Sequence, residues 1–379
     1  MKIVIVCDVL GKKNNGTTIA AYNLIDYLKS KGHDVKVVCC DEDKQNQEGF
    51  IILDKLNLGP LNKIVERNGV TLPKTDRNVI LDAFYECDIV HIMLPFPMGI
   101  TACKIAKKLG KPVTAGFHCQ AELVSSHLGL MNCKFANKHI YKQFYKRIYQ
   151  FCDAIHYPTQ FICDVFENIV GKTNHYVISN GVNPDVKCID CCKPENLKDK
   201  FLILTTGRLC PEKSHMVLLK AIAQSKYNDK IQLIMAGQGP LQSKIEFFAK
   251  KKLKNQPIIQ YFKREEMINL LNFCDLYVHP AEAELEGIAC LEAVVCGLVP
   301  VVSDSNRSAT KNFAITPNNL FKCNNSSDLA SKIDYWIEHP EEKVELKKQY
   351  LQFGNRVDLN DCMEQMEQMF IETIAKRED

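Results

Sequence analysis

Two carboxylates that can contact a ligand stand close together in the second half of the chain. Glu284 lies in the loop after the apolar segment DLYVHP (275–280), and Glu292 follows eight residues later with Gly287 between them. We expect one carboxylate to reach a ligand from a loop and the other from a helix, while the intervening backbone N–H groups face an anion. The alternative is that both acids only complement the positive end of a helix dipole.

Two cations lie in an earlier loop of the same half. TTGRLCPEKSH (205–215) places Gly207, Arg208 and Lys213 between an apolar segment and a helical one. Arg208 offers a planar fork, Lys213 offers a point charge, and the helix dipole adds to both, so the pattern suits a diphosphate. Ordinary solvated side chains are the alternative for such a pair.

Two residues of the first half occupy comparable positions. Gly16 stands at the entrance of a helix after the first apolar segment, where its backbone can approach a substrate oxygen; a plain turn glycine is the alternative. His118 closes the segment PVTAGFH (112–118), where a buried core histidine is the alternative. The loop before Gly16 lacks the G-x-G-x-x-G spacing, which disfavours a nicotinamide or flavin oxidoreductase.

Short β-branched segments that alternate with helical-period stretches must position these residues. They recur between residues 2 and 179 and again, after the polar stretch KPENLKDK (193–200), between 201 and 304. This alternation predicts an α/β protein with two doubly wound parallel sheets. Ligands of such sheets bind beyond the carboxyl ends of the strands, where all the loops described above begin. After Pro340 the sequence predicts an amphipathic helical tail packed on a domain.

Composition limits the function further. The chain has 379 residues with 48 Lys and Arg against 45 Asp and Glu, so we expect two or three globular domains and no nucleic-acid partner. No apolar run approaches the roughly 20 residues of a membrane span, and MKIVIVCDVL indicates a first strand and not a signal peptide. We therefore expect a cytoplasmic protein or one peripheral to the inner face of the cell membrane. The cluster Cys188, Cys191 and Cys192 is weak support for zinc, and we predict no metal.

Several motifs together resemble the retaining glycosyltransferases of family four, which have the GT-B fold. GRLCPEK, AGQGPL and ELEGIACLEAVVCGLVPVV resemble the donor-binding half of that family, and GHDVKVV, HIMLPFP, GFHCQAE and VISNGVNPD resemble the acceptor half, in the same order. The resemblance implies two Rossmann-like domains that face each other across a cleft. Residues 1–193 would bind the acceptor, residues 194–340 the nucleotide-sugar donor, and 341–379 would form C-terminal helices.

The resemblance also implies a reaction and a set of site residues. A hexose would move from a nucleotide-diphosphate sugar, expected to be a UDP-sugar, to an acceptor hydroxyl with retention at the anomeric carbon and without a cofactor. Arg208 and Lys213 match the pair that neutralises the diphosphate, Glu284 the contact to the sugar, and Glu292 the contact to the ribose. The implied catalytic residues are His118, Glu284, Arg208 and Lys213, and the implied donor-binding residues are Gly16, Gly207, Arg208, Lys213, Glu284, Gly287, Ile288 and Glu292.

A basic segment with interleaved aromatic residues suggests where the acceptor comes from. Residues 131–152 contain Lys138, Lys142, Lys146 and Arg147 among six Phe and Tyr residues. Such a helix can lie on an anionic membrane; in the alternative, its aromatic residues pack on the sheet and its lysines are only solvated. A membrane lipid such as diacylglycerol is the leading acceptor hypothesis. A soluble or polysaccharide-linked acceptor, a catalytically silent GT-B scaffold subunit, and an epimerase or phosphorylase are the alternatives.

Overall fold

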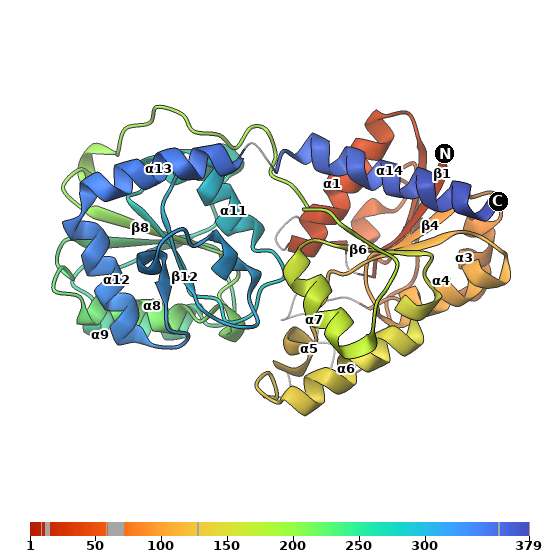
Figure 1. The fold of residues 1–379 in the computed structure, drawn as a ribbon, viewed down its shortest axis with the longest axis horizontal. Helices are drawn as coiled ribbons and strands as arrows, with labels where there is room; N and C mark the ends of the chain where they lie inside the picture. The colour runs from red at the N-terminus through yellow and green to blue at the C-terminus, as the bar shows by residue number, and fades with distance from the viewer. Residues whose placement is uncertain are drawn as a thin grey trace. The chain divides into compact units, whose positions relative to one another are not determined.

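The chain folds into two compact units, each built on a parallel sheet. The computed structural model describes residues 1–8, 10–11, 16–57, 59, 72–126, 129–354 and 357–378. The first unit comprises Met1–Asn180 and Asn360–Asp379, and the second comprises Gly181–Leu359 (Figure 1). The division falls at residue 181 and not at 193, because Val182 and Val186 pack in the core of the second unit.

The sheet of the first unit has the strand order β3-β2-β1-β4-β5-β6-β7 among the described residues, and every pairing is parallel. Strands β4, β5 and β6 are buried along their whole length, as expected for a parallel sheet covered on both faces. The strands are β1 (Lys2–Val6), β2 (Asp34–Cys39), β3 (Phe50–Ile52), β4 (Ile89–Ile92), β5 (Val113–Gly116), β6 (Ala154–Tyr157) and β7 (His175–Val177).

Helices cover this sheet, and the last of them comes from the C-terminal segment. They are α1 (Gly16–Ser30), η1 (Glu42–Lys44), α3 (Arg77–Phe84), α4 (Pro97–Lys108), α5 (Ala121–Ser126), α6 (Lys134–Arg147), η3 (Tyr149–Phe151), α7 (Gln160–Val170) and α14 (Leu359–Glu378). Glu367 of α14 accepts hydrogen bonds from Tyr27 and His33, and Met369 and Phe370 are fully buried. The apolar face of α14 thus packs on the first unit, as expected of an amphipathic tail, whereas the part of 341–379 before residue 360 belongs to the second unit.

The sheet of the second unit has the order β10-β9-β8-β11-β12-β13 among the described residues, again with parallel pairings. Its strands are β8 (Phe201–Thr206), β9 (Ile231–Ala236), β10 (Ile258–Gln260), β11 (Leu276–His279), β12 (Pro300–Ser303) and β13 (Leu320–Phe321). Its helices are η4 (Glu195–Leu197), η5 (Pro211–Lys213), α8 (His215–Gln224), α9 (Gln242–Lys252), α10 (Arg264–Phe273), α11 (Ile288–Val295), η6 (Ala309–Phe313), η7 (Pro317–Asn319), α12 (Ser326–Glu338) and α13 (Pro340–Gly354).

Each sheet reverses its strand order at one place among the described strands. The chain leaves β8 toward β9 on one side, whereas β11 pairs with the other side of β8. The first sheet reverses in the same way between β1 and β4. The loops that follow two such strands diverge, and the crevice between them is where doubly wound sheets bind ligands. The topology therefore singles out the loops after β8 and β11 in the second unit.

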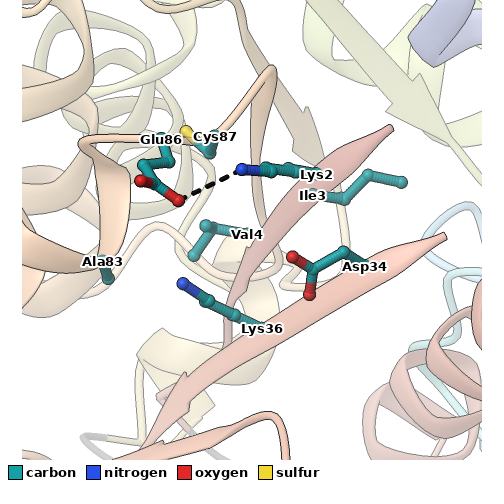
Figure 2. Close-up of a pocket in the computed structure, with 8 residues that line it drawn as sticks. All are labelled: Lys2, Ile3, Val4, Asp34, Lys36, Ala83, Glu86 and Cys87. Carbon is teal, nitrogen blue, oxygen red and sulfur yellow. Dashed lines mark hydrogen bonds and ion pairs between the residues drawn. The ribbon is translucent and has the colours of Figure 1, made fainter.

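A small hollow lies at the opposite, amino-terminal end of the first sheet. Figure 2 shows the residues that line it at the amino ends of β1 and β2. Its volume of about 10 Å³ is enough for about one water molecule. Its most prominent contact is the 3.1 Å ion pair between Lys2 and Glu86, whose side chains are both exposed.

In the described part of the chain, no helix has the length and apolar character that crossing a bilayer requires.

Candidate functional site

The loop after β8 is shaped by glycines that let backbones approach closely. Gly207 has φ +127°, a conformation that residues with a side chain rarely adopt. A Cβ atom on Gly237 would lie 2.0 Å from the Gly207 carbonyl oxygen, and one on Gly239 would lie 2.5 Å from that of Leu209. The motif AGQGPL therefore has a structural role here, which is to support the loop that carries Arg208 and Lys213.

Lys213 forms an ion pair with Glu284, which lies in the loop after β11. Both side chains are largely buried, with 21% and 17% of their surface exposed. Burial raises the pKa of Glu284, but Lys213 and His279 lower it more, so that it falls to about 2. Burial likewise lowers the pKa of Lys213, and the Glu284 carboxylate raises it above its usual value. The two loops thus hold a fully charged pair at neutral pH.

Arg208 lies in the same loop and contacts a different carboxylate. Its Nη2 atom is 3.1 Å from Oε1 of Glu212, and about a third of its side chain remains exposed. Glu212 is also tied to the loop after β11, because its carbonyl oxygen accepts a hydrogen bond of 2.9 Å from the backbone N–H of Glu282. The predicted diphosphate pair, Arg208 and Lys213, is therefore held by acids from both loops.

The backbone around Glu284 is fixed by the segment that follows β12. The Glu284 N–H donates to the carbonyl of Arg307 at 3.1 Å, and the Ala309 N–H donates to the carbonyl of Glu284 at 2.9 Å. Gly287 has φ +82°, and a Cβ atom there would lie 2.3 Å from Cγ2 of Thr310. A glycine is required at this position for both reasons, and α11 begins at the next residue, Ile288.

Glu292 lies on a helix, as the sequence predicted, in the second turn of α11. Its Oε1 atom accepts a hydrogen bond of 2.7 Å from Arg264, which also holds Asp185 at 2.8 Å. Burial raises the pKa of Glu292, although Arg264 partly offsets this effect. Sequence reasoning did not single out Arg264, because the partners come from three distant segments of the chain.

His279 is a second residue that sequence reasoning missed. It ends β11 with only 2% of its surface exposed, and its Nε2 atom lies 3.2 Å from Oε1 of Glu284. Its Nδ1 atom lies 3.4 Å from the hydroxyl of Tyr277, and that hydroxyl lies 2.6 Å from Oγ1 of Thr206 at the end of β8. The alternation of Tyr277 and His279 in a strand was the available signal, since residues two apart face the same side.

In the first unit, Gly16 and His118 are brought close together. Gly16 begins α1, and the hydroxyl of the next residue, Thr17, lies 3.4 Å from the carbonyl of His118. The His118 ring packs so closely on Gly116 that a Cβ there would lie 2.5 Å from its Nε2 atom. Burial, together with the neighbouring His156 and His91, holds the pKa of His118 well below its usual value. His118 is therefore neutral at physiological pH.

The basic segment forms α6, and both of its expected features are present. Tyr141 and Phe144 are buried, and Tyr141 stacks near Phe117 and donates a hydrogen bond of 2.6 Å to Glu122. The cations Lys138, Lys142, Lys146 and Arg147 are all exposed. Phe135, at the start of the helix, is 82% exposed. One face of α6 therefore packs on the domain, and the other presents unburied positive charge.

Among the described residues, one group has the geometry of a metal site, namely Cys163, Glu167 and His175. Glu167 already accepts hydrogen bonds from Thr173 and His175 and pairs with Lys172. These contacts satisfy the carboxylate and close the end of α7, so the group has a structural explanation. It lies apart from the residues that the sequence predicted to be functional.

Two family models match the chain, one in each half. "Glycosyltransferase Family 4" matches residues 14–186, and "Glycosyl transferases group 1" matches residues 192–352. Apart from a short interruption, the two matches extend over 14–352 and divide the chain close to the boundary between its two units.

Comparisons of this chain with individual proteins also find glycosyltransferases and the same fold. An alpha-monoglucosyldiacylglycerol synthase of Streptococcus pneumoniae is 22% identical over 81% of this chain and 71% of its own length. A GDP-mannose-dependent alpha-mannosyltransferase of Corynebacterium glutamicum is 23% identical over 80% of this chain and 72% of its own. The Anabaena protein HepE, solved with UDP and glucose, superimposes with a TM-score of 0.75 at 17% identity, over 98% of this chain and all of that one. The chain belongs to the family-four glycosyltransferases and has the GT-B fold.

Proposed function

We propose that this glycosyltransferase moves a hexose from a UDP-sugar to the hydroxyl group of a membrane lipid, with retention at the anomeric carbon. The observation that carries the proposal is the ion pair of Lys213 with Glu284, with Arg208 in the same loop, at the reversal point of the second sheet. These residues combine two cations for a diphosphate with a carboxylate for a sugar, at the edge where such sheets bind ligands.

Their chemistry suits the departure of a nucleoside diphosphate. The transition state of glycosyl transfer gathers negative charge on the leaving group and positive charge at the anomeric carbon. Arg208 and Lys213 would stabilise the first, and the buried Glu284 carboxylate would hold the hydroxyls of the transferred sugar. Glu292, which accepts a hydrogen bond from Arg264, would accept further hydrogen bonds from the two ribose hydroxyls. Because two side-chain cations neutralise the diphosphate, we propose that the reaction needs no metal.

The choice of donor rests on the relatives. HepE binds UDP and glucose, which supports a UDP-sugar, and the Streptococcus pneumoniae synthase is named for making a glucosylated diacylglycerol. The Corynebacterium glutamicum relative uses GDP-mannose, so GDP-mannose is the second donor to test. UDP and GDP both contain a ribose, so the proposed contact of Glu292 with the ribose hydroxyls does not distinguish between them.

The lipid acceptor is supported by the exposed basic face of α6. Its lysines are one helical turn apart at positions 138, 142 and 146, and Phe135 is exposed at the start of the same helix. A row of cations with an exposed aromatic ring binds anionic lipid headgroups and inserts shallowly at the interface. A lipid acceptor would explain why this face carries charge and an exposed ring together.

Nucleotide release from purified protein tests the proposal. UDP-glucose, UDP-galactose, UDP-N-acetylglucosamine and GDP-mannose are each supplied with anionic vesicles, with or without diacylglycerol, and each arm is run both with and without EDTA. A further arm replaces diacylglycerol by cholesterol, which presents a single hydroxyl at the same interface. We expect release of UDP that requires one of these lipids, and an α-linked product by NMR. Glu284→Gln is the control for contaminating activity.

The remaining outcomes separate the alternatives. Release that is the same without lipid would contradict the lipid acceptor and favour a soluble or polysaccharide-linked one. A β-linked product would contradict retention, and loss of activity in EDTA would contradict the cationic diphosphate site. Failure to bind or turn over any donor would favour a scaffold subunit.

A further inference from the structure

A continuous chain of polar contacts lies behind Glu284. It runs from Thr206, the last residue of β8, to Tyr277 and then to His279, the last residue of β11, before it reaches the carboxylate. All three side chains are buried, with 8%, 0% and 2% of their surfaces exposed. β8 and β11 are neighbours in the sheet, with Tyr277 opposite Leu204. The chain of contacts therefore links two neighbouring strands in the interior of the second sheet.

The chemistry of the groups allows only one direction for the protons along this chain. An ionised carboxylate can only accept, so the Nε2 atom of His279 carries a proton and donates it to Glu284. The Nδ1 atom of the neutral ring is then an acceptor, and the Tyr277 hydroxyl donates to it. The tyrosine oxygen in turn accepts from the Thr206 hydroxyl. Each donor faces one acceptor, and the tautomer of His279 is determined.

Burial is the main reason why the ring of His279 stays neutral. Burial lowers the pKa of His279, and the Lys213 ammonium adds to this effect, while Glu284 opposes it. Tyr277 faces the other ring nitrogen, and burial raises its pKa well above the usual range. Neither His279 nor Tyr277 therefore carries a charge near neutral pH. His279 can orient the Glu284 carboxylate without changing the net charge of the site.

Lys213 and His279 both contact the same oxygen, Oε1, of Glu284. A lysine on its flexible stem supplies charge but little orientation. A histidine on a strand, locked by two hydrogen bonds, supplies orientation. We propose that His279 is a positioning residue, which with Tyr277 and Thr206 fixes the Glu284 carboxylate so that its second oxygen binds the sugar of the donor. This inference rests on the proposed function and assigns how the sugar contact is made.

Two substitutions at position 279 separate positioning from packing. His279→Leu keeps the volume but removes the donor, whereas His279→Gln places an amide N–H near the position of Nε2. The affinities for UDP and for the UDP-sugar that the wild type uses are measured by calorimetry, together with kcat and KM. We expect His279→Leu to weaken UDP-sugar binding and to lower kcat/KM roughly tenfold to a hundredfold, because a hydrogen bond to a charged group is lost. UDP alone, which lacks the sugar, should bind as before, and His279→Gln should restore most of the loss.

A spectroscopic measurement tests the inference without any donor. In protein labelled with ¹⁵N-histidine, the His279 resonance, assigned from its absence in His279→Gln, should show a neutral ring protonated on Nε2 at pH 7. Tyr277→Phe removes the donor to Nδ1 and should shift that resonance with the fold intact. A proton on Nδ1, a charged ring, or equal loss of UDP and UDP-sugar affinity in His279→Leu would overturn the inference. If the wild type uses no donor but the tautomer is as expected, the proposed function and the sugar contact fail, while the orientation of the Glu284 carboxylate by His279 stands.

Discussion

Lys213 and Glu284 form a buried ion pair that joins two loops 71 residues apart in the chain. One loop follows β8 and the other follows β11, the two strands between which the sheet reverses its order. The pair therefore links the stability of the second unit to the residues that are proposed to bind the donor. Substitutions at either position should affect both properties, and the two effects can be separated.

Removal of one partner should cost more stability than removal of both. Glu284→Leu leaves Lys213 buried without its counter-ion, and we expect a loss of roughly 3 kcal/mol in the free energy of unfolding. Lys213→Met combined with Glu284→Leu should recover part of this loss, while turnover stays abolished in both. Urea denaturation with parallel activity measurements tests this expectation. A double variant that is less stable than both single variants would contradict it.

Stability should fall in acid through Glu284. Its pKa is about 2 in the folded protein, because Lys213 and His279 outweigh the effect of burial. A carboxylate with a lowered pKa contributes stability above its unfolded pKa, and this contribution is lost as the pH falls toward 2. From pH 5 to pH 2 the wild type should lose roughly 3 kcal/mol more than Glu284→Gln, which has no proton to take up. Identical pH profiles for the two proteins would refute this prediction.

Gly287→Ala should damage the second unit for two separable reasons. The backbone there has φ +82°, and the new methyl group would clash with Cγ2 of Thr310. Gly171→Ala is a matched control, because Gly171 has φ +96° with open space around its Cβ position. We expect a loss of about 1 kcal/mol for the control and more for Gly287→Ala. Adding Thr310→Ser removes the clashing methyl, and the absence of any rescue in thermal unfolding would argue against the clash.

Charge reversal on α6 should release the protein from anionic vesicles. Lys138, Lys142 and Lys146 each contribute about 1 kcal/mol to binding if they face the lipid surface. The triple Glu variant should therefore lose sedimentation with phosphatidylglycerol vesicles, and wild-type binding should weaken with salt. The same reversal of Lys250, Lys251 and Lys252 on α9 changes the net charge equally and is the control. Equal losses in both variants would indicate non-specific attraction.

Arg264→Gln should make nucleotide binding depend on pH. Burial raises the pKa of Glu292, and Arg264 is the cation that lowers it again. Without Arg264, the Glu292 pKa should rise further, and the carboxylate that is proposed to hold the ribose should be protonated at a higher pH. The affinity for UDP should then fall between pH 8 and pH 5 in the variant more steeply than in the wild type, as calorimetry can measure. Parallel curves would contradict the ribose contact.

The sequence alone determined the fold and supplied most of the residues of the candidate site. The alternation of β-branched and helical segments predicted two parallel sheets, because strands buried on both faces must be apolar throughout. The order of the family motifs then identified the GT-B fold, which the comparisons confirm. Local spacing also marked Glu284, Arg208 and Lys213, since each lies in the connection that follows a strand.

The tertiary structure decided which of these residues contact one another. Neither the pair of Lys213 with Glu284 nor that of Arg264 with Glu292 leaves a local pattern, because their partners lie 71 and 28 residues apart. His279 resembled an ordinary strand end until the register of β8 and β11 placed Thr206, Tyr277 and Glu284 around it. Likewise, α14 joins the first unit because its apolar face packs there, which periodicity alone cannot specify. The periodicity of apolar residues indicates which face of a helix or strand is buried. Only the tertiary structure determines which other element packs against that face.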